Sequence, residues 1–470
     1  MVKDHYNFAF IEVVEMKKHD VNMLSGSITK GLWAISFPIM IMNVVQSLFN
    51  IIDMTILKEF DPGDGIAVGA VGVCGVLITL FTNLVIGIAT GSNVVIARNI
   101  GKGDQEAVDR SVGSSVLFSL VAGSAMAVIG IVCAPLLLKW NNCPDALFKD
   151  GTLYFRLYFV GFPIIMVYNF CASILRSSGD SRRPMIYLTA GGILKVALTY
   201  LFTAAFHMGV AGVAFATILS QSLPCFLGMR ALSKNQGAVK LRKEYFRFYK
   251  EELLDILRIG IPTSVQRVVY SLANVLITAT VNSFGPAATT GVSIANQYDG
   301  ILYNITTAPS LAVMPYVSQN IGAGNVKRAT QSVWKSILIT TVLGVGFGAL
   351  SAGFSGPLSS IMASDPAVIT YSQQKMVVVS SLYFLQGINE IFGAALRGMG
   401  KPTVATVCAF LYMCVFRFFW VYVIFPLCPP SLSFLYLVWP VGWTLCIITM
   451  LFVFFPTVKK LKAKAAANQT

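Results

Sequence analysis

Long apolar runs separated by short polar loops fill the chain from about residue 31 onward. A helix needs about 20 apolar residues to cross the hydrocarbon core of a membrane, and twelve segments reach this length. They lie near residues 31–57, 66–97, 108–138, 149–175, 184–206, 209–230, 253–281, 288–318, 330–355, 368–396, 403–426 and 432–457. The pattern predicts an all-α polytopic membrane protein with twelve transmembrane helices.

The two halves of the chain repeat each other. NIGKG at 99–103 corresponds to NIGAG at 320–324, an offset of 320 − 99 = 221 residues. The LR pair at 175–176, before SSGD, corresponds to the LR pair at 396–397, before GMGK, with the same offset of 397 − 176 = 221. Because six helices per half is an even number, the halves share one topology. We therefore expect two pseudo-symmetric six-helix bundles around a central cleft, as in many secondary transporters.

This organisation divides the chain into five parts. The predicted parts are a cytoplasmic N-terminal tail (1–30), an N-terminal six-helix lobe (31–230), a cytoplasmic basic linker (231–252), a C-terminal six-helix lobe (253–457) and a cytoplasmic basic tail (458–470). The leading tail lacks the apolar core and cleavage site of a signal peptide.

The placement of charge predicts the orientation. The chain is 55% hydrophobic and 12% charged, with a net charge of 35 − 21 = +14, whereas soluble domains carry about 25% charged residues. Lys and Arg concentrate in alternate loops, in the linker and in the C-terminal tail. Because cytoplasmic loops are enriched in these residues, we expect both termini to be cytoplasmic in a bacterial-type cell (plasma) membrane. The basic excess is thus explained without a nucleic-acid partner.

Residues for metal or covalent chemistry are sparse. The nine cysteines form no CxxC pair or zinc spacing, and two of the three histidines lie in the leading tail. No Walker A phosphate-binding motif occurs in the sequence. We therefore predict a protein that is not an enzyme and that needs no metal or other cofactor.

Polar side chains inside the spans are the candidates for function, since lipid-facing positions would be costly for them. An intramembrane Asn or Gln often only hydrogen-bonds a neighbouring helix, and this structural role stays open for each amide. A carboxylate must be neutralised by a proton, a metal ion or a basic partner, which favours function for Asp53 and Glu390. The predicted lining of the substrate cleft is Gln46, Asn50, Gln266, Tyr270, Asn274, Gln386, Glu390 and Arg417.

Several motifs resemble the multidrug and toxic compound extrusion (MATE) family of transporters. The segments are FPIMIMNVVQSLFNIIDMTIL (37–57), RNIGKGD (98–104), GVAGVAFAT (209–217), QNIGAGN (319–325) and ALRGMGKP (395–402). The resemblance covers essentially everything after residue 25. It implies two six-helix lobes around a V-shaped cleft. It also implies an antiporter that exports amphipathic, often cationic, compounds in exchange for inward H⁺ or Na⁺.

The resemblance also implies a cation-coupling site in the first lobe. The aspartate of the family's Q-x6-D pattern corresponds to Asp53, and the threonine of its sixth-helix GxAGxAxAT run is present as Thr217. The fifth-helix Asn and its acid or amide partner are replaced by Lys195 and Thr199.

The second lobe departs from the family pattern as well. Tyr270 and Gln386 stand where some members carry a Glu and an Asp. Glu390 lies one helical turn further on, and its repeat counterpart is Asn169, which completes the predicted cation-coupling set.

Lys195 lies in a segment that is apolar for about a dozen residues on either side. We expect it to pair with Asp53, with a pairing to Glu390 or a water-facing lysine as alternatives. An ammonium beside Asp53 would hold the carboxylate ionised and repel Na⁺, and positions 195 and 199 have lost oxygen ligands for a hard cation. The sequence thus predicts coupling to protons rather than to sodium. A fixed positive charge would also disfavour a cationic substrate nearby.

A lipid or lipid-linked saccharide flippase of the same superfamily is the alternative function. Such flippases tend to have a strongly basic cavity and extra helices, whereas twelve spans and the two LR motifs favour the exporter. The predicted partners are a small amphipathic substrate, H⁺ or Na⁺ as the coupling ion, and the lipid bilayer. The predicted state is a monomer.

Overall fold

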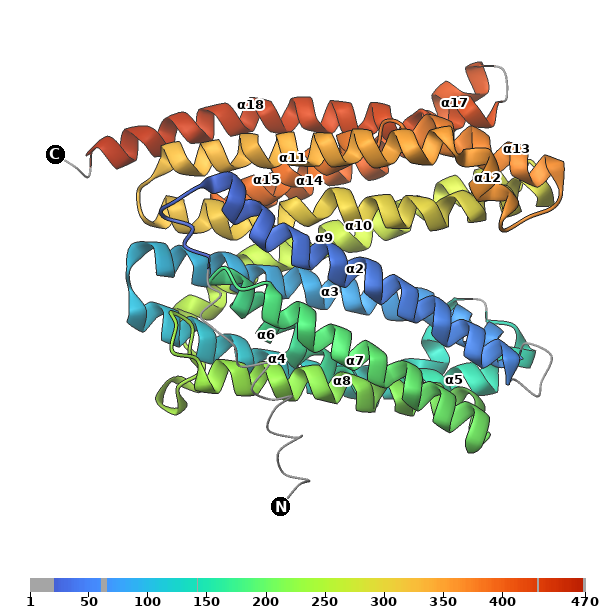
Figure 1. Ribbon diagram of the computed structural model, residues 1–470, viewed down its shortest axis with the longest axis horizontal. Coiled ribbons are helices and arrows are strands. Elements are labelled where there is room, and N and C mark those ends of the chain that lie inside the picture. Colours follow the sequence, from blue (N-terminus) through green and yellow to red (C-terminus); the bar gives the residue numbers. More distant parts are fainter. Residues whose placement is uncertain (1–20, 61–65, 142, 429–430, 468–470) are drawn as a thin grey trace. The chain divides into compact units, whose positions relative to one another are not determined.

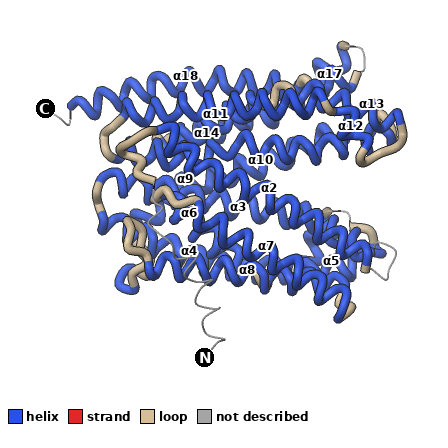
Figure 2. Tube along the Cα trace, in the orientation of Figure 1, coloured by secondary structure: helices blue, strands red, loops and turns tan. Residues whose placement is uncertain are grey.

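The computed structural model describes residues 21–60, 66–141, 143–428 and 431–467. Within these ranges every regular element is helical (Figures 1 and 2). The predicted all-α architecture is therefore confirmed for the described part of the chain. Most of the predicted N-terminal tail, residues 1–20, and the last three residues, 468–470, lie outside it.

The first six predicted spans correspond to seven α-helices and one π-helical turn. They are α2 (Ile28–Glu59), α3 (Ile66–Lys102), α4 (Gln105–Trp140), α5 (Asp145–Val160), α6 (Phe162–Ser177), α7 (Arg182–Tyr200), η1 (Leu201–Ala205) and α8 (Gly209–Lys234). The predicted span 149–175 is in fact two helices, α5 and α6, bent by 47°. Gly161 separates them and Pro163 stands in the first turn of α6, where a proline interrupts an incoming helix but suits a new one.

The helices of the second half are interrupted more often than those of the first. Its elements are α9 (Lys250–Asn282), α10 (Pro286–Gly322), α11 (Val326–Gly353), α12 (Ser355–Ser360), α13 (Pro366–Lys375), η3 (Met376–Ser380), α14 (Phe384–Gly398), α15 (Pro402–Phe410), η4 (Leu411–Val415), α16 (Phe416–Phe419), η5 (Trp420–Ile424), η6 (Phe425–Leu427), α17 (Leu432–Tyr436) and α18 (Val438–Ala467). The predicted span 368–396 is bent by 45° between its α13–η3 part and α14. The predicted span 403–426 contains the π-helical turns η4 and η5.

The capacity of a helix to span a membrane depends on its length and composition. Eight of the described helices are long and apolar enough to cross a membrane, and the number rises to ten if each bent pair counts as one span. Helices α9 and α10 are not among these ten described segments. Charged residues crowd the start of α9, and α10 carries several amides and an aspartate. The count of twelve spans therefore stays a prediction, whereas a multi-pass membrane protein is supported.

The chain folds into two compact units. Of the described residues, the first unit comprises those within 21–22, 41–96 and 104–254, and the second comprises those within 23–40, 97–103 and 255–467. In the first unit, α7 packs on α8 and α4 packs on α5 and α6. In the second, α10 packs on α11, α13 and α14 (Figure 1). The predicted lobe limits of 31–230 and 253–457 stay a prediction.

The repeated NIGxG motifs meet each other within the second unit. A Cβ on Gly101 would lie 2.0 Å from the backbone oxygen of Gln319, and a Cβ on Gly322 would lie 2.2 Å from the backbone oxygen of Arg98. The last glycine of each motif, Gly103 and Gly324, has φ +74°, a conformation that favours glycine. The two NIGxG motifs therefore share two features. Each has a glycine in close contact with the backbone of the other motif's helix, and each ends its helix at a glycine with positive φ.

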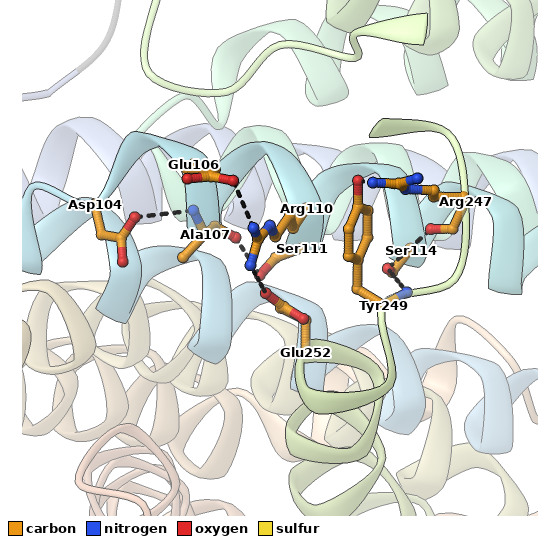
Figure 3. A network of polar contacts seen from close by, with 9 residues as sticks. All are labelled: Asp104, Glu106, Ala107, Arg110, Ser111, Ser114, Arg247, Tyr249 and Glu252. Carbon is orange, nitrogen blue, oxygen red and sulfur yellow. Dashed lines mark hydrogen bonds and ion pairs between the residues drawn. The ribbon is translucent and has the colours of Figure 1, made fainter. Parts of the chain in front are cut away.

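The basic linker packs against the start of α4 in the first unit (Figure 3). The Ser114 hydroxyl accepts a hydrogen bond from the Tyr249 backbone N–H at 3.0 Å and donates one to the Arg247 carbonyl at 3.2 Å. The Arg110 guanidinium lies 2.5 Å from Glu106 and 4.0 Å from Glu252, and it faces the Tyr249 ring at 5.3 Å. These contacts fix the described linker residues to the unit.

Candidate functional site

Asp53 on α2 is the centre of a buried polar cluster in the first unit. The residue is 5% exposed. Its Oδ2 forms an ion pair with the Lys195 ammonium of α7, and its Oδ1 accepts a hydrogen bond from the Thr199 hydroxyl at 3.1 Å. Of the partners considered for Lys195, the structure thus brings it to Asp53.

Two glycines let α7 approach its neighbours just before Lys195. A Cβ on Gly192 would lie 2.0 Å from the ring of Phe49 on α2, and a Cβ on Gly191 would lie 3.0 Å from Pro224 on α8. Phe49 and Gly192 stand about one helical turn before Asp53 and Lys195, respectively. Small residues allow close helix packing in membranes, so this contact brings the two charged residues within reach.

The other predicted members of the coupling set form hydrogen bonds within their own helices. The Thr217 hydroxyl donates to the Val213 carbonyl of its own helix at 2.9 Å. The Asn169 side chain donates to the Ile165 carbonyl of its own helix at 2.8 Å. The cluster thus contains Asp53, Lys195 and Thr199, and the roles assigned to Thr217 and Asn169 stay predictions.

Two predicted cleft residues belong to the first unit. Gln46 is exposed and lines a small cavity of about 40 Å³ together with Lys195. The side chain of Asn50 lies outside the described residues.

The predicted cleft residues of the second unit form two groups. In the first, the buried Arg417 donates to Asn274 Oδ1 at 2.7 Å, and its guanidinium lies 5.5 Å from the centre of the Tyr270 ring. In the second, Arg397 donates to Gln266 Oε1 at 3.1 Å and lies 3.9 Å from Glu390.

Glu390 therefore has a basic neighbour within its own helix, α14. Gln386, one turn earlier on α14, is 0% exposed, and neither polar atom of its side chain has a hydrogen-bond partner among the described residues. A buried amide without partners is costly.

The second unit contains a buried ion pair that was not predicted from the sequence. Lys375 on α13 lies 2.9 Å from Asp299 on α10 and also donates to Asn296 Oδ1. Ser380 donates to Asp299 at 3.3 Å. Asn296 and Asp299 are three residues apart on one helix face, and this spacing is the signal that could have marked the site. Lys375 gave no such signal because it stands near the start of a predicted span, where lysines often reach the interface.

The described residues contain no cluster of three or more His, Cys, Asp or Glu side chains that could hold a metal ion. Asp53 and Asp299 are each engaged by a lysine instead. Each of the two carboxylates therefore has a basic partner within its own unit.

Comparison with known proteins matches two blocks of the chain, residues 38–201 and 262–423, to the family model MatE. The "Probable multidrug resistance protein YpnP" of Bacillus subtilis is 25% identical over 403 residues, which are 86% of this chain and 89% of that protein. The "FAD transporter" of Shewanella oneidensis is 24% identical over 393 residues, or 82% of this chain and 85% of that protein.

Solved structures have the same fold. An outward-facing multidrug resistance MATE family transporter of the MOP superfamily aligns with a TM-score of 0.88 at 21% identity, covering 95% of this chain and 100% of that one. A MOP superfamily transporter from Pyrococcus furiosus, described as having a binding pocket of reverse polarity, aligns with a TM-score of 0.87 at 22% identity. The alignment covers 95% of this chain and 99% of that one.

Proposed function

The chain belongs to the MatE family of membrane transporters, and from this premise we propose that it exports amphipathic organic compounds in exchange for an inward cation. The proton is favoured over sodium as that cation. Relatives named as multidrug resistance proteins over more than four fifths of this chain support the efflux direction.

The observation that carries the choice of ion is the Asp53–Lys195–Thr199 cluster. The Lys195 ammonium already neutralises the Asp53 carboxylate, so a sodium ion there would face a fixed positive charge. Sodium would also need several oxygen ligands in place of water, and the lysine offers none. A proton meets the same positive charge, but it needs only a single oxygen lone pair and can bind the carboxylate once the ammonium moves away.

The proposed cycle uses two charge states of this cluster. In one, Asp53 is ionised and paired with Lys195. In the other, a proton on Asp53 neutralises the carboxylate and releases the ammonium, which must then find water or another partner because its burial uncompensated is costly. Substrate and proton are coupled if each favours a different one of these states.

The test is transport in proteoliposomes with the gradients imposed separately. A panel of anionic, neutral and cationic naphthalene derivatives is added while a trapped pH dye reports proton movement. We expect a proton gradient to drive exchange without sodium, and we expect Asp53→Asn to abolish it. Exchange driven by a sodium gradient at fixed pH would disprove proton coupling. Empty liposomes are the control for passive leakage.

The proposal includes a location and an orientation. The protein lies in the plasma membrane of a bacterial-type cell as a multi-pass monomer with both termini in the cytoplasm. The distribution of Lys and Arg along the sequence supports this orientation.

A further inference from the structure

A groove of about 860 Å³ lies in the first unit, where α8 ends and the linker begins. Its wall contains Met229 and Ser233 of α8, residues 240–244 of the linker, and Phe246. Helix α8 is long and apolar enough to cross a membrane, and it ends at Lys234. Met229 precedes that end by 234 − 229 = 5 residues, about 7 Å along the helix. The groove therefore lies where a membrane-spanning helix leaves the hydrocarbon core.

Contacts with α4, a second helix that can span the membrane, hold the linker beside the groove. The Gln105 side chain donates to the Ala238 carbonyl at 2.9 Å, and the Arg242 guanidinium lies 3.2 Å from the buried Asp109 carboxylate. The hydrogen bonds of Ser114 hold the far end of the linker (Figure 3). These contacts lie before, within and after the lining segment, so they fix the wall of the groove.

The groove has a net positive charge. Three lining side chains are basic, Lys240, Arg242 and Lys243, and one is acidic, Glu244. Arg242 is paired with Asp109, so the five charges sum to 3 − 2 = +1. Lys240 and Lys243 are exposed, and neither forms an ion pair with a carboxylate of the described residues. These two ammonium groups are therefore available to an anionic ligand.

The positive charge continues along the chain on both sides of the groove. Residues 230–250 contain seven Lys or Arg residues and a single acidic one, Glu244. Four to eight basic residues next to a membrane span are typical of segments that bind anionic lipids. Phe246 and Phe248 are 41% and 48% exposed, and exposed aromatic rings suit the boundary between headgroups and acyl chains. Basic and aromatic side chains therefore occur together at the level of the lipid headgroups.

An apolar face of α8 leads into the groove. Leu219, Phe226, Met229 and Ser233 follow one another at intervals of seven, three and four residues, so they lie on one side of the helix. Leu219 is 47% exposed and Phe226 is 64% exposed. A ligand that occupies both this face and the groove needs a hydrophobic part and an anionic part. A free phosphate compound has only the second.

We propose that the groove binds a membrane phospholipid with a net anionic headgroup. The phosphate meets the ammonium groups of Lys240 and Lys243, which attract phosphate as point charges, and the acyl chains pack along the Leu219 and Phe226 side of α8. A phospholipid that carries its own ammonium group has no net charge and brings a cation into a groove that is already positive. The net charge of the headgroup therefore decides which lipid binds. No residue of the Asp53 cluster lines the groove, so this site does not rest on the proposed transport.

The test is equilibrium binding of lipids to the purified full-length protein in a non-ionic detergent. Native mass spectrometry measures the bound fraction for dioleoyl phosphatidylglycerol and dioleoyl phosphatidylcholine, which share their acyl chains and differ in net charge. We expect phosphatidylglycerol to bind about ten-fold more tightly, the scale of one or two lysines beside an anionic headgroup. Equal or tighter binding of phosphatidylcholine would overturn the proposal.

A soluble phosphate distinguishes a lipid site from a site for a free phosphate compound. At the concentration that saturates phosphatidylglycerol binding, sn-glycerol 3-phosphate should displace little of the bound lipid, because it lacks acyl chains. If it displaced the lipid as fully as added phosphatidylglycerol does, the groove would be a site for a free phosphate compound and the lipid assignment would be wrong.

The double variant Lys240→Gln with Lys243→Gln locates the binding. It should bind phosphatidylglycerol about ten-fold more weakly and change phosphatidylcholine binding little. The matched control is Lys459→Gln with Lys460→Gln, which removes the same charge from two exposed lysines of α18 in the second unit. Equal weakening by both double variants would mean that lipid is attracted by the net charge of the protein alone, which contradicts a site in the groove.

The substitution Glu244→Gln tests the same site in the opposite direction. It removes the carboxylate from the described lining, so phosphatidylglycerol should bind about five-fold more tightly, the scale of one charge near the membrane surface. Unchanged or weaker binding by the folded variant would count against the proposal. These measurements use no ion gradient and no transported substrate, so their failure leaves proton coupling through Asp53 untouched.

Discussion

Two lysines of the helical bundles are held in buried ion pairs, Lys195 with Asp53 and Lys375 with Asp299. Removing one partner of such a pair leaves an uncompensated charge and is more damaging than replacing both. At each pair, a single substitution and the double substitution should therefore change the free energy of unfolding by different amounts. The first belongs to the proposed coupling site, and the second lies in the second unit.

We predict that Lys375→Met lowers the free energy of unfolding by about 3–5 kcal/mol, because it strands the Asp299 carboxylate. The double variant Lys375→Met with Asp299→Asn should recover most of that loss, since no charge remains. Thermal unfolding in detergent, followed by tryptophan fluorescence, measures both. The buried-pair argument would be contradicted if the stability lost by the double variant equalled the sum of the losses of the two single variants.

We also predict that Lys195→Asn combined with Thr199→Asp creates a response to sodium. The pair of substitutions places an amide and a carboxylate oxygen beside Asp53 and removes the competing ammonium. A bound ion stabilises the folded state, so NaCl should raise the unfolding temperature of the double variant above its value in KCl. The unsubstituted protein should show no difference between the two salts. Sodium-specific stabilisation of the unsubstituted protein would count against proton coupling.

For single residues, the sequence pointed to a site where the polarity of a residue differed from that of its neighbours along the chain. Lys195 was identifiable because its neighbours along the chain are apolar. Lys375 was not, because it stands beside polar residues at the start of a span, and only packing shows that it is 2% exposed and faces α10. The partner of a charged residue depends on tertiary contacts, and the spacing of residues along one helix does not show these contacts.

Helix ends and helix contacts rest on a few glycines. A Cβ at position 101 would meet the Gln319 backbone oxygen at 2.0 Å, and backbone cannot move aside as a flexible side chain can. We predict that Gly101→Ala lowers the free energy of unfolding by about 1–3 kcal/mol, the usual cost of overpacking.

The matched control for that substitution is Gly346→Ala on α11. No atom lies within 4 Å of a Cβ at that position. Alanine is also the better helix former, by up to about 1 kcal/mol. The control should therefore leave the unfolding temperature unchanged or raise it. If both variants unfolded at the same temperature, the close contact of the NIGxG motifs would not contribute to stability.

The linker depends on a second close approach. A Cβ on Gly113 of α4 would lie 1.9 Å from the backbone oxygen of Tyr245. Gly113→Ala should therefore displace the segment that carries Tyr245 and Arg247, and expose its basic residues. We expect faster tryptic cleavage between residues 240 and 250. Gly75→Ala, where nothing lies within 4 Å of the added carbon, should be cleaved at the original rate.

Hydropathy located the helices well, but not their interruptions. The bend between α5 and α6 has a sequence cause in Gly161 and Pro163. The bend between η3 and α14 has neither proline nor glycine at residues 376–384. Its π-helical turn is set by packing, with Met376 and Val379 buried. Periodicity alone does not distinguish such a segment from a straight span.

For the whole molecule, the repeat was the strongest signal in the sequence. An offset of 221 relates residues that adopt the same backbone conformation: Gly103 and Gly324 both have φ +74°, and Gly179 and Gly400 have φ +100° and +79°. The repeat does not extend to the charged sites. Asp299 and Lys375 correspond to Ile78 and Tyr154 at that offset, so the second unit has an ion pair without a counterpart in the first. Duplication thus predicts the scaffold, while the charged sites differ between the two halves.

The distribution of basic residues leads to a prediction about the whole chain. Helix α18 continues to Ala467 and ends in a segment that contains Lys459, Lys460, Lys462 and Lys464. A membrane retains such a segment on the cytoplasmic side. A fluorescent protein that matures only in the cytoplasm, fused after Thr470, should therefore fluoresce, and alkaline phosphatase fused there should be inactive.

The matched fusion after Asp365, in a predicted outer loop, should give the opposite pair of results. Reversed results at both positions would mean that the chain is inverted. Active phosphatase at both positions would mean that an even number of spans lies between Asp365 and the C-terminus, so that one of the segments 368–396, 403–426 and 432–457 does not cross the membrane. The pair of fusions therefore tests the orientation and the count of the last three spans together.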